Sequence, residues 1–333
     1  MEENASNRRD WLKHVGAGVL ARGALSRLCH AEDVISEKNI PEPPAFQLPR
    51  ARLVLFGGGI GNNKSIKERV QALGLTDAKQ LPAEEYDPAG MYHELAKNVD
   101  FKDKTVVCFT ASSDEPDASA ENLKTLFTLL GAGNVITISN QEQANRHDYA
   151  RILENRAALA FFCGGDQDRA SAAYKDTLAH KALVKRALED ASFTIAGTSA
   201  GAAVMSAHMI NGGDPEKVVD KMKSGLGLLH LIIDTHINGD EPDRILEKRP
   251  ERLQAAVTKH SDRIGIGLDV ATGIILTNGM LSVIGDGNAY IAQVGQPQKL
   301  LTQHSPEYHL GDHAAMPVPH WYREPELARA QGR

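Results

Sequence analysis

The sequence predicts an α/β fold in which a mostly parallel central sheet is covered by helices on both faces. Two observations lead to this prediction. Strand-like and helix-like segments alternate along the chain, which is the pattern of βαβ units. Several strand-like segments, among them 104–110 and 159–162, contain continuous apolar runs, and strands of this kind are buried on both faces. Because ligand sites in such sheets gather at the carboxyl ends of strands, we expect the functional residues there.

The first predicted strand, Arg52–Phe56, ends in a glycine-rich run at 57–61. This run lacks the third glycine of a dinucleotide-binding turn, and no helical pattern follows at once, so we do not expect a nucleotide there. The strands predicted next are 104–110, 135–138, 159–162 and 193–196, and the helices predicted between them are 118–131, 149–155 and 177–190.

A second group of short elements follows residue 230. The Asn-Gly pair at 278–279 is a strong hairpin signal between two of its strands. The strands predicted here are 231–233, 264–269, 272–276, 281–284 and 289–292, with a helix at 249–260. Residues 51–300 are therefore the predicted folded domain. Residues 301–333, rich in proline and histidine with little periodicity, are a predicted C-terminal surface extension.

Composition excludes several classes of protein. The chain has 333 residues, enough for one large or two modest domains, with 42% apolar and 24% charged residues. A net charge of -6 gives no reason to expect nucleic acid or an anionic membrane as a partner. No apolar run reaches the ~18 residues of a membrane span. The three cysteines have neither disulfide-framework nor metal-ligand spacing, so no metal and no cofactor is expected.

The first residues resemble a twin-arginine export signal. Arg8-Arg9 precede an apolar pair and a lysine, and a weakly apolar run of small residues follows at 15–21. Residues 1–31 are therefore a predicted signal segment, and the proline-containing stretch 32–50 is a predicted linker. The protein is then expected to be exported to the periplasm or beyond. The alternative is a basic leader on a cytoplasmic protein.

Ser199 is the predicted nucleophile. It stands in a Gly-x-Ser-x-Gly motif at 197–201, between an apolar strand and a helix-forming run. A serine on such a sharp strand-to-helix turn projects its hydroxyl away from the sheet, and the N-terminus of the helix offers free N–H groups to an oxyanion. The alternative interpretation is a glycine-rich turn or a phosphate loop.

His236 is the predicted general base, because it closes the apolar strand 231–233 and so also lies at a strand end. Gly164-Gly165, which follow strand 159–162, can turn backbone N–H groups into the same cleft. The alternative for these glycines is an ordinary strand-to-helix turn.

Four ordered blocks resemble the serine peptidase family that contains cyanophycinase and dipeptidase E. The blocks are Gly164–Gln167, Gly197–Ser206, Gly225–Leu229 and Ile233–His236. The resemblance implies a class I glutamine-amidotransferase-like sandwich and a homodimer. It also implies hydrolysis of cyanophycin, a polyaspartate that carries arginine on its side chains, to β-aspartyl-arginine dipeptides.

The resemblance also implies roles for individual residues. The nucleophile would be Ser199 and the general base His236, and the backbone N–H groups of Gly165 and Ala200 would form the oxyanion hole. In the substrate pocket it would place Gln167 and Asp234.

The chain departs from the family pattern beside His236. The family has Asp-Gln-His-Phe where this chain has Asp234-Thr235-His236-Ile237, which puts Thr235 in the substrate pocket. The family then carries an Arg-x-Arg-x-x-Arg-like run, whereas here the stretch 238–244 is acidic and keeps only Arg244. Like charges facing a carboxylate-rich ligand are unfavourable. The expected substrate is therefore another peptide or an isopeptide of β-aspartyl type, rather than cyanophycin itself.

The acid that would orient His236 is a further departure from the family pattern. The family has Asp-Glu-x-Thr, and here Val270 occupies the glutamate position. Asp269 and Asp214 are the candidate replacements, although neighbouring strand residues point to opposite faces, which argues against Asp269. The alternative function is a catalytically degenerate binding protein. A glutamine-amidotransferase activity is disfavoured because those enzymes use cysteine where this chain has Ser199.

Overall fold

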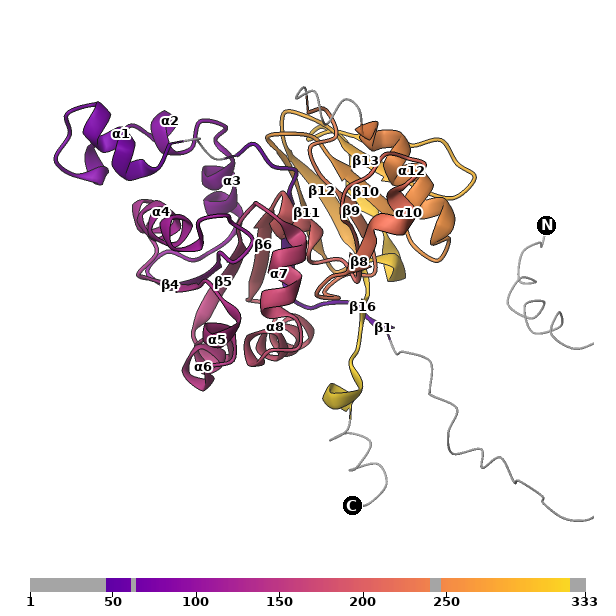
Figure 1. Cartoon of the computed structure of the whole chain (residues 1–333), viewed down its shortest axis with the longest axis horizontal. Coiled ribbons are helices and arrows are strands. Elements are labelled where there is room, and N and C mark those ends of the chain that lie inside the picture. Colours follow the sequence, from indigo (N-terminus) through magenta and orange to yellow (C-terminus); the bar gives the residue numbers. More distant parts are fainter. Residues whose placement is uncertain (1–45, 61–63, 240–246, 324–333) are drawn as a thin grey trace, which may run out of the picture. The chain divides into compact units, whose positions relative to one another are not determined.

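A computed structural model of the protein describes residues 46–60, 64–239 and 247–323 (Figure 1). All of them belong to one compact unit, residues 44–333. The predicted signal segment 1–31 and most of the predicted linker 32–50 lie outside the described residues, and so does Arg244.

The central sheet has eight strands. In spatial order they are β15 (Tyr308–His309), β12 (Met280–Gly285), β11 (Thr272–Thr277), β2 (Arg52–Phe56), β6 (Thr194–Thr198), β5 (Ala157–Phe162), β3 (Thr105–Phe109) and β4 (Asn134–Ile138). The run from β2 to β4 is parallel, whereas β11, β12 and β15 are antiparallel. The prediction of a mostly parallel central sheet is confirmed.

Helices cover both faces of this sheet (Figure 1). Alternate residues of β2 enter different cores: Leu53 and Leu55 pack on one face, and Val54 and Phe56 on the other. The helices are α1 (Ile66–Ala72), α2 (Ala83–Tyr86), α3 (Met91–Asn98), α4 (Pro116–Leu129), α5 (Gln141–Ala144), α6 (His147–Asn155), α7 (Gln167–Tyr174), α8 (Leu178–Glu189), α9 (Ala200–Ala203), α10 (Val218–Lys221) and α12 (Arg249–Lys259). Apolar side chains of α3 and α4 cover one face, and those of α6 and α8 cover the other.

The short strands after residue 230 divide between two sheets. β11 and β12 extend the central sheet, joined through the Asn278-Gly279 turn. A separate four-stranded sheet contains β14 (Lys299–Leu301), β13 (Ala289–Ala292), β10 (Gly265–Leu268) and β9 (Ile232–Asp234). Two small pairs complete the sheets: β1 (Phe46–Gln47) with β16 (Met316–Pro317), and β7 (His208–Ile210) with β8 (Met222–Ser224).

The stretch 301–323 differs from the surface extension expected from its sequence. It contributes β15 and β16, and the side chains of Leu310, Ala314 and Met316 are buried in the main core. These apolar residues are too widely spaced to give a periodic pattern, so their burial depends on contacts with distant strands. Among the described helices, none is long and apolar enough to cross a membrane.

Candidate active site

Ser199 lies at the turn between β6 and α9, with a backbone φ of 53° and ψ of -120°. A non-glycine residue rarely takes such a conformation, and it persists only where the surroundings enforce it. The flanking glycines show why the turn is tight. A Cβ atom on Gly197 would lie 2.4 Å from the Gly201 carbonyl oxygen, and one on Gly201 would lie 2.2 Å from the Phe162 carbonyl oxygen. The Gly-x-Ser-x-Gly motif thus forms a strained strand-to-helix elbow.

His236 follows β9 and reaches the serine. The Ser199 Oγ atom lies 2.7 Å from His236 Nε2, which is hydrogen-bond distance. The backbone N–H of His236 donates to the Gly57 carbonyl at 2.8 Å, and that of Ser199 donates to the neighbouring Phe56 carbonyl at 3.0 Å. The imidazole is 9% exposed, so the pair is largely shielded from water.

Gly58 makes room for this contact, and sequence reasoning missed it. Its φ is +104°, and a Cβ atom there would lie 2.2 Å from His236 Nε2. The sequence places the glycine-rich run 57–61 at a strand end, where sites gather, and disfavours a nucleotide there, but it gives Gly58 no role. Its position at the end of the central strand, next to the Ser199 strand, was the signal that could have assigned it to the catalytic pair.

Gly165 and Ala200, whose backbone N–H groups the family resemblance makes the oxyanion donors, lie in the lining of the Ser199 cavity. Gly165 follows β5 with a φ of 133°, and a Cβ atom there would lie 2.1 Å from the Ser112 carbonyl oxygen. Ala200 is the first residue of α9, where helical N–H groups have no partner within the helix. Both residues line the same cavity as Ser199, so the geometry suits two oxyanion donors.

That cavity has a volume of about 320 Å³. The predicted pocket residues Gln167, Asp234 and Thr235 all line it, together with Ser199 and His236. The Gln167 amide nitrogen donates to the Ile210 carbonyl at 2.8 Å, which fixes the side chain. No group of three or more His, Cys, Asp or Glu residues within the described ranges could hold a metal ion.

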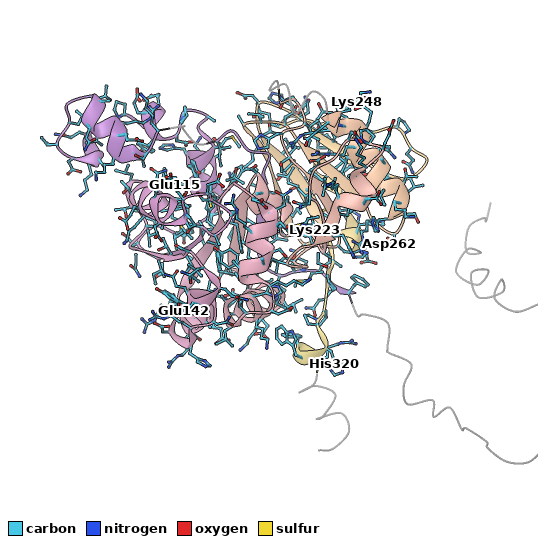
Figure 2. The ribbon with its side chains drawn as sticks, in the orientation of Figure 1. Glu115, Glu142, Lys223, Lys248, Asp262 and His320 are labelled. Carbon is cyan, nitrogen blue, oxygen red and sulfur yellow. The ribbon has the colours of Figure 1, made fainter. Side chains whose placement is uncertain are left out.

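Two arginines also line this cavity, and this corrects the sequence prediction that only Arg244 remains. Arg249 and Arg252 have the spacing of the last two arginines in the Arg-x-Arg-x-x-Arg run, and Glu247 stands at the position of the first. The sequence comparison placed the run directly after His236, whereas these residues come several positions later, at the start of α12. Lys248, between Glu247 and Arg249, is exposed on the surface (Figure 2).

The charges of these arginines are already paired. Arg252 donates from Nε and Nη2 to the Asp234 carboxylate, at 2.9 and 2.5 Å, and its Nη1 lies 3.0 Å from Glu247 Oε2. Arg249 donates from Nε to the same Glu247 oxygen at 2.9 Å and from Nη1 to the Thr235 carbonyl. Burial lowers the pKa of Arg252, but the Asp234 carboxylate outweighs it, so the net shift is upward.

Neither candidate orienting acid contacts His236. Asp214 pairs with Lys217, whose ammonium lies 3.1 Å from Oδ2 and lowers the pKa of this carboxyl. Asp269 is 1% exposed and accepts from the backbone and side-chain nitrogens of Asn288, both at 2.9 Å. Both positions are therefore corrected: these carboxylates satisfy neighbouring loops.

Val270, at the position of the family's glutamate, packs on the glycine-rich loop after β2. A Cβ atom on Gly59 would lie 2.2 Å from Val270 Cγ1, so this side chain packs on the same glycine loop that makes room for His236. The side chain of Asp269 instead contacts Gly287 and Asn288. Asp269 and Val270 lie beyond the end of β10 (Gly265–Leu268), in the turn before β11, and their side chains have different neighbours.

Comparisons with known proteins agree with this fold. The sequence model of peptidase family S51 matches residues 90–284. Cyanophycinase from Trichormus variabilis is 32% identical over 221 residues, which cover 64% of this chain and 70% of that protein. Cyanophycinase from Geminocystis herdmanii is 31% identical over 197 residues, 57% of this chain and 69% of the relative.

A crystal structure of a peptidase from an acI-B1 Actinobacterium has the same fold, with a TM-score of 0.55 and 21% identity. The match covers 78% of this chain and 96% of that one. The fold and the family match together define an enzyme, a serine-type peptidase with a class I glutamine-amidotransferase-like sandwich. The chain belongs to peptidase family S51.

Proposed function

We propose that the protein hydrolyses a peptide or β-aspartyl isopeptide bond through an acyl-enzyme on Ser199. The observation that carries the proposal is the 2.7 Å contact between Ser199 Oγ and His236 Nε2 at a strained elbow. Strain of this kind is concentrated at functional sites. A serine hydroxyl is a weak nucleophile by itself and becomes effective when a base accepts its proton.

In the proposed reaction, Ser199 Oγ attacks the carbonyl carbon while His236 Nε2 takes the hydroxyl proton. The carbonyl oxygen becomes an oxyanion and accepts hydrogen bonds from the N–H groups of Gly165 and Ala200. The C–N bond then breaks, and His236 donates its proton to the departing amine. A water molecule, deprotonated by His236, cleaves the resulting ester, which releases the acid product and restores Ser199.

The charges in the cavity support a substrate other than a polyanion. Among the residues that the structure describes, its lining contains three carboxylates, from Asp166, Asp234 and Glu247, against two guanidinium groups, and the guanidinium groups already bind two of those carboxylates. Glu247 Oε1 makes no hydrogen bond within the described part of the chain, so it offers an acceptor to a ligand. We infer that the substrate presents a cationic or hydrogen-bond-donating group here, and that cyanophycin is a poor substrate.

A fluorophosphonate probe tests the nucleophile, because it reacts covalently with activated serines. We expect wild type to be labelled, Ser199→Ala to remain unlabelled and His236→Ala to react far more slowly. Ser224→Ala is the control, since that residue is an exposed serine on β8. Equal labelling of wild type and Ser199→Ala would refute the mechanism.

The alternative of a non-hydrolytic binding protein has no observation in its favour. Hydrolysis of any member of a peptide library, abolished in Ser199→Ala, would exclude it. Export and a homodimeric state stay predictions from the sequence and its family resemblance.

A further inference from the structure

A second cavity, of about 280 Å³, adjoins Ser199. It shares only Ser199 with the first cavity among the described residues. Its other lining comes from the loop after β2, from α3 and α4, and from the ends of β5 and β6. These residues are Gly59, Ile60, Tyr92, Ser119, Asn122, Leu123, Cys163, Gly164 and Thr198.

The two cavities differ in charge. No described residue that lines the second cavity carries a charge at neutral pH, because burial raises the pKa of both Tyr92 and Cys163 and so keeps them protonated. The described lining of the first cavity includes five charged side chains. A charged group entering the second cavity would lose water without gaining a partner, which is costly.

The wall of the second cavity is firmly held. The Tyr92 ring packs against Phe127 and Phe161, with ring centroids 6.3 and 5.8 Å apart. The side-chain oxygen of Asn122 accepts a hydrogen bond from the Ile66 backbone N–H at 2.8 Å. The amide nitrogen of Asn122 makes no hydrogen bond within the described ranges, so it can donate one to a ligand. The cavity therefore suits an apolar or neutral polar side chain.

We propose that this cavity is a second substrate subsite, which binds an uncharged side chain on one side of the scissile bond. The first cavity then holds the cationic or hydrogen-bond-donating group on the other side. The proposal rests on the proposed function, because Ser199 is the point at which the two cavities meet the bond that is cleaved. Substrate specificity would then come from two pockets, one with charged lining residues and one whose described lining is uncharged.

Binding can be measured without turnover in the Ser199→Ala variant. The probes are two dipeptide series, Xaa-Arg and Arg-Xaa, in which Xaa is Ala, Leu, Asn, Glu or Lys and binding is followed by titration calorimetry. In one of the two series, Leu and Asn should bind at least about tenfold more tightly than Glu and Lys, because the cavity cannot pair a charge.

Asn122→Asp, added to Ser199→Ala, is the discriminating variant. It keeps the oxygen that accepts from Ile66 but adds a negative charge to the cavity. Binding of the Leu and Asn peptides should weaken at least about tenfold, and binding of the Lys peptide should tighten. Asn134→Asp is the matched control, because that residue is exposed at the start of β4, whereas the cavity lies at the carboxyl ends of β5 and β6.

Ser119→Leu offers a second variant that introduces no charge. The larger side chain should fill part of the cavity, so it should weaken binding of the Leu peptide and leave binding of the Ala peptide unchanged. Equal affinities across both series, no binding at all, or the same loss for every peptide in Asn122→Asp would overturn the subsite. A clear preference together with absent hydrolysis by wild type would instead uphold the subsite and refute the proposed function.

Discussion

Gly58→Ala tests the geometry of the catalytic pair most directly. The added Cβ atom would lie 2.2 Å from His236 Nε2, whereas ordinary contacts begin at 3.4 Å. The imidazole must therefore retreat by about 1.2 Å, the difference between those two distances, or the loop must move. Either shift breaks the 2.7 Å contact with Ser199. A misplacement of ~1 Å costs about 100-fold in rate, and complete loss of the base costs up to about 10⁶-fold.

The assay is the rate of fluorophosphonate labelling, compared with wild type at equal concentrations of folded protein. Gly74→Ala is the matched control, because Gly74 has a φ of +66° and nothing within 4 Å of an added Cβ atom. It carries backbone strain of the same kind without the steric clash. If Gly58→Ala labels as fast as Gly74→Ala, the glycine does not set the position of His236 and the reasoning is wrong.

Three further predictions concern buried charges. Arg252→Ala removes the main ion-pair partner of the buried Asp234 carboxylate and should lower the free energy of unfolding, measured by chemical denaturation, by about 3–5 kcal/mol. The control is Arg146→Ala, which breaks an exposed ion pair and should lower the free energy of unfolding by less than about 1 kcal/mol. Burial lowers the pKa of His180 below 6.5, so the unfolded chain binds the proton first as pH falls. The free energy of unfolding should therefore decrease as pH falls below about 6.5, and it should decrease less steeply in His180→Gln than in wild type. Equal pH dependence in wild type and His180→Gln would contradict this prediction. Glu247→Gln removes the charge that pairs with Arg249, while Arg252 stays bound to Asp234. It should raise kcat/KM for substrates with a carboxylate about tenfold relative to cationic ones, and an unchanged ratio would count against our account of the cavity.

The parts of the site that follow directly from strand ends could be predicted from the sequence. Ser199 and His236 each close an apolar run, and adjacent strand ends bring such residues to one edge of the sheet. The central sheet was predictable for the same reason, since its parallel strands are continuously apolar. The separate sheet of β9, β10, β13 and β14 was not, because the local pattern of a strand does not say which neighbour it pairs with.

The polar lining of the first cavity could not be read from motif spacing alone. The arginines of α12 follow His236 only after several intervening residues, so a comparison by spacing assigned their places to acidic residues. Asp269 and Asp214 looked suitable by position, yet each is committed to its own loop. Which carboxylate serves which partner depends on the direction of the side chain, and that is set by tertiary packing.

β2 holds both members of the catalytic pair through consecutive carbonyl groups. Phe56 accepts from the Ser199 amide and Gly57 accepts from the His236 amide. When this strand slides or tilts, the Ser199 hydroxyl and the His236 imidazole therefore move in the same direction. The distance between them then changes little as the sheet fluctuates. An insertion at the end of β2 would separate the two carbonyl groups that hold Ser199 and His236. The two side chains would then move independently, although neither residue had been substituted.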